Sequence, residues 1–146
     1  MSRSFLGKLG VAPCVMLIGP VAFWWDTDEY KHWDLPEHWQ YVRYREMLND
    51  ALVEHGFLVY RHWEAFKGTW NDDFQDINNI MLDRAFAVVD ITPTFAWSEG
   101  RDTEIGRLRE TGTMYKLITA PMPKDESEFA WKIKEVLATL DNMLDT

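Results

Sequence analysis

The feature that most restricts the fold of this chain is an alternation of short apolar runs with longer segments of helical periodicity. The clearest run, residues 85–91, is rich in β-branched and aromatic residues and is typical of a buried strand. Similar runs at 11–18, 57–61 and 115–120 are separated by helical patterns. Strands that alternate with helices form a parallel sheet covered on both faces. We therefore predict an α/β fold of flavodoxin-like or Rossmann-like type: a three-layer sandwich with a parallel sheet of four to five strands.

The helical segments begin and end at residues that suit helix termini. The first is predicted from Asp34, which can cap it, to Gly56, and two more at 72–84 and 100–111. The last opens with a capping box that starts at Asp125. Apolar residues at helical spacing should bury one face of the first and last helices: Tyr41, Tyr44, Leu48, Ala51, Leu52, Phe129, Ile133, Val136, Leu137 and Leu140.

One domain accounts for the chain. Its 146 residues, with 47% hydrophobic and 27% charged residues, are enough for one core and too few for two ordinary domains. Residues 1–10 read as a polar tail, and 11–146 form the single predicted domain, without repeats or linkers.

Charge and cysteine content exclude several classes of function. The net charge of −9, without a cluster of Lys and Arg, argues against a nucleic-acid polymer as partner, whereas a single nucleotide is still compatible. Cys14 is the one cysteine, and no Cys/His pattern indicates a metal. Because Pro and Gly interrupt the longest apolar stretch, we expect no membrane span and a cytoplasmic location.

The segment that follows the run at 85–91 is the place where we expect chemistry. It lies at the carboxyl end of a predicted strand, where open α/β sheets bind ligands. Ser98, Gly100 and Glu104 come at the start of the next helix, whose unpaired N–H groups and dipole attract anions. The sequence thus predicts an anion site there, with the carboxylate of Glu104 held in its ionised form.

Two further loops should meet this segment at the same edge of the sheet. Gly19 and Pro20 end the first strand, and a long aromatic loop that includes Trp24 follows them. Residues 72–79 open the helix before the third strand.

Taken together, these segments resemble the nucleoside 2-deoxyribosyltransferase-like family, which includes nucleoside 5′-monophosphate N-glycosidases and uncharacterised phage and bacterial relatives. In that family the first strand ends in Gly-Pro. Its signature is Ser or Asp, any residue, Gly, three residues and Glu, often followed by Ile-Gly. The resemblance covers about residues 13–120, and its matching residues are Gly19, Pro20, Ser98, Gly100, Glu104, Ile105 and Gly106.

The resemblance implies a role for each end of the signature. The family's glutamate attacks the anomeric carbon of the sugar and expels the base, as the carboxylate nucleophile of a retaining glycosidase does. Glu104 is therefore the expected nucleophile. The monophosphate hydrolases have a serine at the position of Ser98, so Ser98 and Gly100 are expected to bind the 5′-phosphate.

The remaining contacts are less closely tied to the signature. Gly19 and Pro20 would let the backbone approach the sugar. Asp76 is the best match for the family's Asp that contacts the base or sugar, and Asp73, Asn78 and Asn79 are the alternatives. The aromatic candidates for stacking on the base are Trp24 and Trp97, for which packing against a helix or a second subunit is the other interpretation.

The function expected from the resemblance is cleavage of the base–sugar bond of a (2′-deoxy)nucleoside 5′-monophosphate, without metal or organic cofactor, by a homodimer. One alternative is a transferase that moves the sugar between bases. The other is a nucleotide-binding protein without catalysis, in line with two departures from the family. Met16 stands where many members have Tyr, and Asp102 stands where many have Gly, which would raise the pKa of Glu104 or crowd a phosphate.

Overall fold

The chain forms one parallel sheet with helices on both faces. The computed structural model describes residues 12–20, 36–61, 72–94 and 99–145. Within these, four strands pair in the order β2-β1-β3-β4, and every pairing is parallel. The predicted α/β class and flavodoxin-like strand order are confirmed. The strands are β1 (Cys14–Ile18), β2 (Leu58–Tyr60), β3 (Ala87–Asp90) and β4 (Leu117–Thr119).

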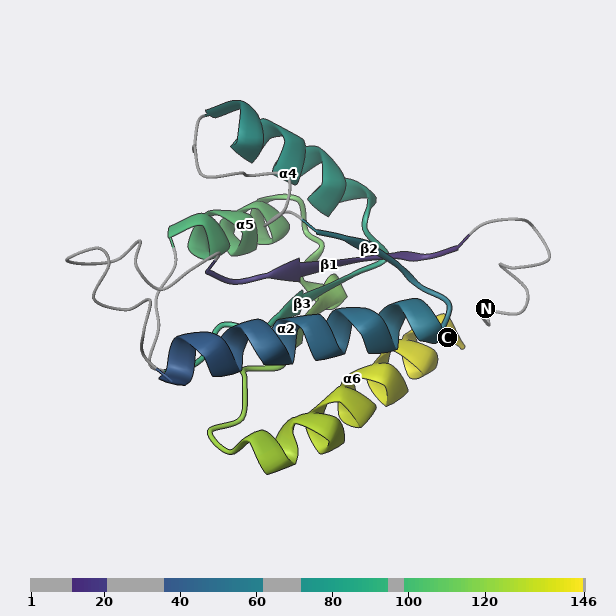
Figure 1. The fold of residues 1–146 in the computed structure, drawn as a ribbon. Coiled ribbons are helices and arrows are strands. Elements are labelled where there is room, and N and C mark those ends of the chain that lie inside the picture. The colour runs from purple at the N-terminus through teal and green to yellow at the C-terminus, as the bar shows by residue number, and fades with distance from the viewer. Residues whose placement is uncertain (1–11, 21–35, 62–71, 95–98, 146) are drawn as a thin grey trace.

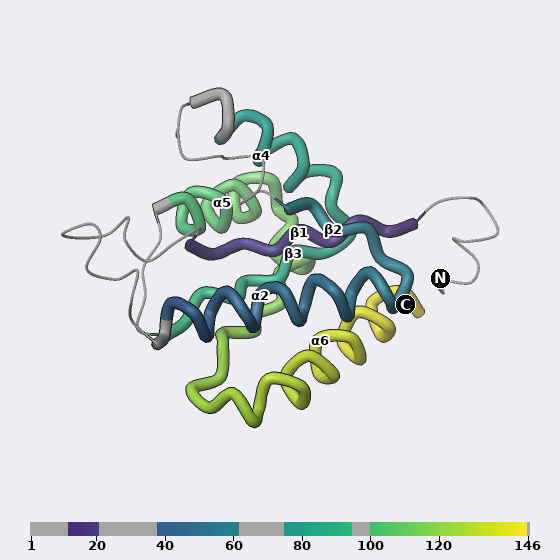
Figure 2. The backbone as a smooth tube through the Cα atoms, viewed as in Figure 1, coloured from purple at the N-terminus to yellow at the C-terminus, as the bar shows by residue number. Residues whose placement is uncertain are grey.

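The helices form the two outer layers of the sandwich (Figure 1). On one face of the sheet α2 (Pro36–Glu54) lies beside α6 (Phe129–Leu144), and the other face is covered by α4 (Asp72–Arg84) and α5 (Glu99–Glu110). The path of the chain in Figure 2 explains this division. From β1 the chain crosses to β2 on one side, and from β2 it returns past β1 to β3, so right-handed crossovers place α2 and α4 on opposite faces.

Alternation along the central strands divides the core into two halves. In β1, Val15 and Leu17 face α2 and α6, whereas Met16 and Ile18 face α4 and α5. The predicted apolar face of α2 is buried, except that Ala51 is half-buried, and Leu137 of α6 is likewise half-buried. Fully or nearly fully buried members of the larger half are Val15, Leu17, Tyr41, Tyr44, Leu48, Leu52, Val89, Phe129 and Leu140.

Two short 3-10 helices alter the predicted boundaries. The η3 helix (Met114–Lys116) occupies the start of the run predicted as a strand from 115, so β4 begins only at Leu117. The η4 helix (Glu126–Glu128) precedes α6, and the Asp125 carboxylate accepts the Ser127 N–H at 3.0 Å. Asp125 therefore caps η4. The predicted capping box would place it at the start of α6, but the 3-10 turn lies between Asp125 and that helix.

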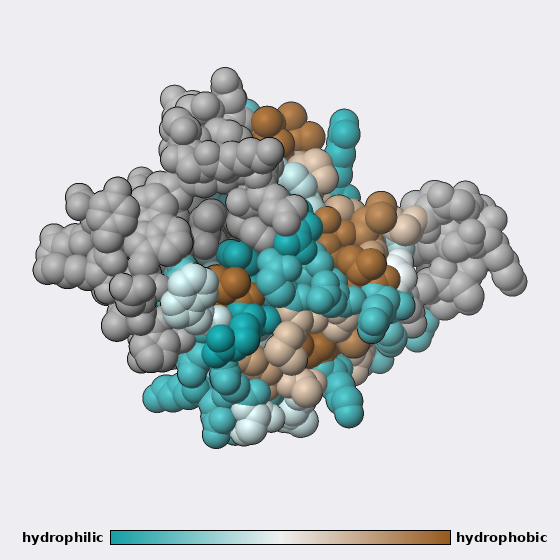
Figure 3. Space-filling model, viewed as in Figure 1, coloured by the Kyte–Doolittle hydropathy of each residue, from teal (hydrophilic) through white to brown (hydrophobic). Residues whose placement is uncertain are grey.

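Apolar side chains also reach the surface. On α4, Ile77 is 47% and Ile80 51% exposed, and Figure 3 shows hydrophobic residues at the surface over this helix.

Cys14 is half-buried at the start of β1. In the part of the chain that the structure describes, no helix combines the length and apolar character needed to cross a bilayer.

Candidate functional site at the carboxyl ends of β1 and β3

The candidate site lies where the direction of the chain reverses between two neighbouring strands. β1 leads to β2 on one side and β3 leads to β4 on the other, so their carboxyl ends form the switch point of the sheet. Gly19 follows β1 directly, Asp90 ends β3, and the Ile91 N–H donates to the Ile18 carbonyl at 3.0 Å. Open α/β sheets bind their ligands at such a point.

The turn after β1 is packed tightly against α2. Gly19 has a φ of +151°, and a Cβ built there would lie 2.7 Å from the hydroxyl oxygen of Tyr41 and 3.3 Å from Oγ1 of Thr92. The Tyr41 hydroxyl donates a buried hydrogen bond to the Pro20 carbonyl at 2.7 Å. Close packing thus favours glycine at position 19, and an approach of the Gly19-Pro20 backbone to a sugar stays a prediction.

Glu104 is buried at this edge, on the inner side of α5. It lies in the second turn of the helix and is 3% exposed. Its Oε2 atom has no hydrogen-bond partner among the described residues. Burial, and then the negative charge of Asp90, raises the pKa of Glu104 to about 8. The prediction that the helix end keeps this carboxylate ionised is therefore wrong, because Glu104 is buried in the second turn of α5 and near the negative charge of Asp90.

Asp90, which is buried, forms an ion pair with the half-buried Arg101 beside Glu104. Asp90 is 2% exposed, its Oδ1 accepts the Thr92 N–H at 3.0 Å, and its Oδ2 accepts Nε of Arg101 at 2.9 Å. A second Arg101 nitrogen donates to Asp102 at 2.7 Å. Asp102 is exposed and takes part in this pairing, so the raised pKa of Glu104 comes from burial and Asp90 and not from Asp102.

Tyr60 and Asn78 close the side of the site next to β2 and α4. The Tyr60 hydroxyl donates to Oδ1 of Asn78 at 3.1 Å. Burial, and then the negative charge of Glu104, raises the pKa of Tyr60. Asn78 is 4% exposed, whereas Asp76 is exposed to solvent. On α4, Asn78 is joined to this cluster, whereas Asn79 pairs with Gln75 along the helix.

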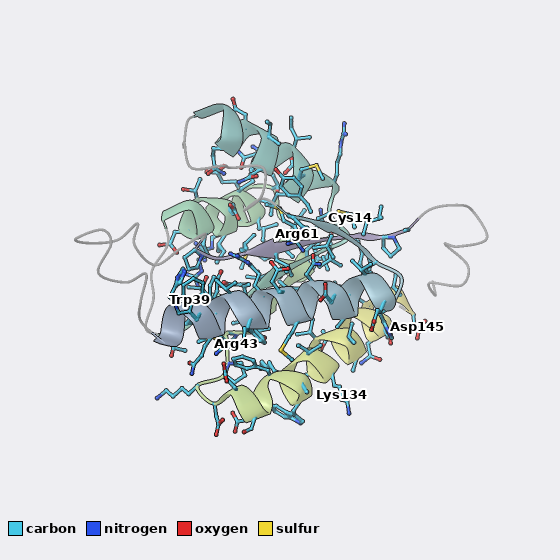
Figure 4. The ribbon with its side chains drawn as sticks, in the orientation of Figure 1. Cys14, Trp39, Arg43, Arg61, Lys134 and Asp145 are labelled. Atoms are coloured by element: carbon cyan, nitrogen blue, oxygen red, sulfur yellow. The ribbon has the colours of Figure 1, made fainter. Side chains whose placement is uncertain are left out.

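Basic residues gather on the opposite face of the sheet, between α2 and the end of β2. Arg45 is 8% exposed and lies 5.6 Å above the ring of Tyr41. Arg61, labelled in Figure 4, follows β2 and donates to both carboxylate oxygens of Glu46 on α2, at 2.9 and 3.0 Å. On this side, as on the α5 side, cations and carboxylates are paired: Arg61 with Glu46, and Arg101 with Asp90.

Of the remaining predicted site residues, some lie among the described residues and some do not. Gly100 is half-buried in the first turn of α5. Trp24, Trp97 and Ser98 lie outside the described residues, as does the side chain of Asp73. Within residues 12–20, 36–61, 72–94 and 99–145, no group of three or more His, Cys, Asp or Glu side chains is arranged to hold a metal ion.

Sequence reasoning assigned no role to several residues that the fold brings together here. Asp90 could have been noticed in the sequence, because it is a carboxylate within an otherwise apolar run. Charged residues are rarely fully buried in a strand unless they have a partner. Tyr60 and Thr92 have ordinary positions and could not be found in this way. The sequence predicts Tyr41 only as part of the buried helix face, and Arg101 only as an added charge for a phosphate or as a solvent-facing side chain.

Comparison with known proteins adds no relative. No protein-family model, no curated protein and no solved structure matches this chain. The functional argument therefore rests on the geometry of Glu104 and its neighbours and on the sequence signature that contains it.

Proposed function

We propose that this protein hydrolyses the base–sugar bond of a nucleoside 5′-monophosphate, with Glu104 as the nucleophile. The observation that carries the proposal is the buried carboxyl of Glu104, whose Oε2 has no hydrogen-bond partner among the described residues. An unsatisfied buried polar atom lowers stability and calls for an explanation, and strongly perturbed carboxyl groups concentrate at functional sites. Its position at the switch point of the sheet supports a role toward a ligand.

The sequence signature supports the class of reaction. Ser98, Gly100 and Glu104 have the spacing seen in the nucleoside 2-deoxyribosyltransferase-like family, and Gly19-Pro20 ends the first strand as it does there. In the proposal, Ser98, which precedes α5 in the sequence, and Gly100 of its first turn would supply the hydroxyl and N–H groups that suit a phosphate. The substrate we propose is therefore a nucleotide with a 5′-phosphate.

In the proposed reaction the ionised carboxylate of Glu104 forms a bond from one oxygen to the anomeric carbon. The bond between that carbon and the base nitrogen breaks, and its electron pair leaves with the base, which takes a proton from water. The hydroxide left by that proton transfer then attacks the anomeric carbon of the glycosyl ester, and the bond to the Glu104 oxygen breaks, which releases the sugar 5-phosphate and restores the carboxylate. The products are one free base and one sugar phosphate for each water consumed.

The raised pKa of Glu104 sets a condition on this reaction. With a pKa of about 8, the carboxyl is largely protonated at pH 7. Only about a tenth of the unliganded molecules then carry the nucleophilic form, since one pH unit corresponds to a factor of ten. We expect kcat/KM to rise with pH up to about 8 and then to level, because this parameter reports the ionisation of the free enzyme.

The test is release of base from each ribo- and deoxynucleoside 5′-monophosphate and from the matching nucleosides, followed by chromatography. Glu104→Gln should abolish release. Glu110→Gln is the matched control, because Glu110 lies on the same helix and is exposed. If no monophosphate or nucleoside releases base, the proposal is refuted and the site is better explained as a nucleotide-binding pocket without catalysis. Release only when a second free base is supplied would instead establish a transferase, which would use the same nucleophile.

A further inference from the structure

The geometry points to a positioning role for Arg101: through its ion pair with Asp90, it sets the protonation state of the Glu104 carboxyl. This inference rests on the proposed function for its catalytic meaning, but its physical content can be measured without turnover. No part of the sequence signature assigns a role to Arg101 or Asp90.

The three side chains come from two elements that meet at one point. Asp90 is the last residue of β3, and Arg101 and Glu104 are three residues apart on α5, so both lie on the same side of that helix. Nε of Arg101 lies 2.9 Å from Oδ2 of Asp90. Asp90 and Glu104 are 2% and 3% exposed, so little water screens the charge of one carboxyl from the other.

Arg101 is the cation that balances Asp90 at this position. Asp90 of β3 is the charged group that raises the pKa of Glu104, and Glu104 in turn raises the pKa of Tyr60 of β2 and of Tyr41 of α2. Arg101, on the same helix as Glu104, is joined to Asp90. Asn78 of α4 reaches the same cluster through Tyr60 and is uncharged. With the charge of Asp90 offset by Arg101, the Glu104 carboxyl loses its proton more easily than it would beside an unpaired Asp90.

The two partners should therefore act on Glu104 with opposite sign. Asp90→Asn removes the like charge but keeps an oxygen that can accept the Thr92 N–H, so Glu104 should ionise at lower pH. Arg101→Gln leaves the negative charge of Asp90 unbalanced, so Glu104 should ionise at higher pH. A role limited to holding α5 on the sheet predicts no such opposition, since either change would only loosen the same contact.

The experiment is carbon-13 NMR titration of the full chain, with glutamate labelled at the side-chain carboxyl and the Glu104 signal identified by its loss in Glu104→Gln. We expect the midpoint to fall by about one pH unit in Asp90→Asn and to rise by about one in Arg101→Gln, the low end of the shift that a nearby charge produces. Arg107→Gln is the matched control, because Arg107 of α5 pairs with Asp83 at 2.6 Å in an exposed position. It should leave the midpoint unchanged.

A fourth variant guards against loss of structure. Arg101→Lys keeps the cation and should return the midpoint close to the wild-type value, whereas a damaged fold would not show this recovery. Equal midpoints in wild type, Asp90→Asn and Arg101→Gln would overturn the inference even if base release is found. Absence of base release together with opposite shifts would refute only the proposed function. Where release occurs, the pH profile of kcat/KM should move with the NMR midpoint in each variant.

Discussion

Replacement of Glu104 by glutamine should change how the stability of the protein depends on pH. The pKa of this group is raised from 4.5 to about 8 by burial and by Asp90. The unfolded chain therefore loses the Glu104 proton near pH 4.5, whereas the folded chain keeps it until about pH 8. Between these values the folded state binds more protons than the unfolded state, so stability falls as pH rises.

The magnitude follows from the interval between the two pKa values. Each pH unit within it lowers the free energy of unfolding by about 1.4 kcal/mol, which sums to about 5 kcal/mol above pH 8. Glutamine cannot ionise and escapes this loss. The stability of Glu104→Gln relative to wild type should thus increase steadily from pH 5 to pH 8 and then stay level, whatever constant cost the buried amide adds.

Urea unfolding of both proteins at intervals of one pH unit measures this difference. The subtraction removes groups common to both proteins, such as the ion pair of His55 and Asp141. Glu110→Gln, at an exposed position of the same helix, should differ from wild type by no more than about 0.5 kcal/mol at every pH. A difference between Glu104→Gln and wild type that does not vary with pH would show that Glu104 is not held protonated in the folded protein.

Three further predictions concern the residues around this carboxyl. In thermal unfolding, Gly19→Ala should destabilise the protein by about 1–3 kcal/mol, because its Cβ would meet the Tyr41 hydroxyl at 2.7 Å. Gly106→Ala should stabilise it by about 0.5–1 kcal/mol, because a Cβ there would have nothing within 4 Å. Tyr41→Phe should cost about 1–3 kcal/mol in urea unfolding, because the buried Pro20 carbonyl loses its donor. Asn78→Ala should cost a similar amount and Asp76→Ala less than about 0.5 kcal/mol; equal costs would contradict the buried Tyr60–Asn78 contact.

Much of the fold could be predicted because its signals are local. The helix over 72–84 has the predicted bounds, and the helix before Gly112 ends one residue earlier than expected. Gly112 adopts a φ of +70°, the left-handed conformation that favours glycine after a helix. The start of β4 was missed because Met114–Lys116 form a 3-10 turn, which apolar composition alone does not distinguish from a strand.

The site was predictable in location but not in chemistry. The signature around Glu104 and the Gly-Pro turn both lie at the carboxyl ends of the central strands, as expected from the order of elements. The charge state of Glu104 depends instead on which way its side chain turns from α5 and on what lies beneath it. Asn78 rather than Asp76 faces the cluster for a similar reason: the angle at which α4 lies on the sheet decides which of its polar residues is buried.

The ion pair of Asp90 and Arg101 is hard to explain by stability alone. Removing the Asp90 carboxylate from water, and the half-buried Arg101 guanidinium in part, carries a desolvation cost that their attraction often fails to recover, and apolar pairs of similar size are frequently as stable. Asp90 also adds to the cost of a second buried carboxyl, since it helps to raise the pKa of Glu104. A core that served only folding would have an aliphatic residue at the end of β3, as it has at Val88 and Val89. The charged arrangement is accounted for if the protonation of Glu104 matters to what the protein does, which connects the ion pair to the proposed chemistry.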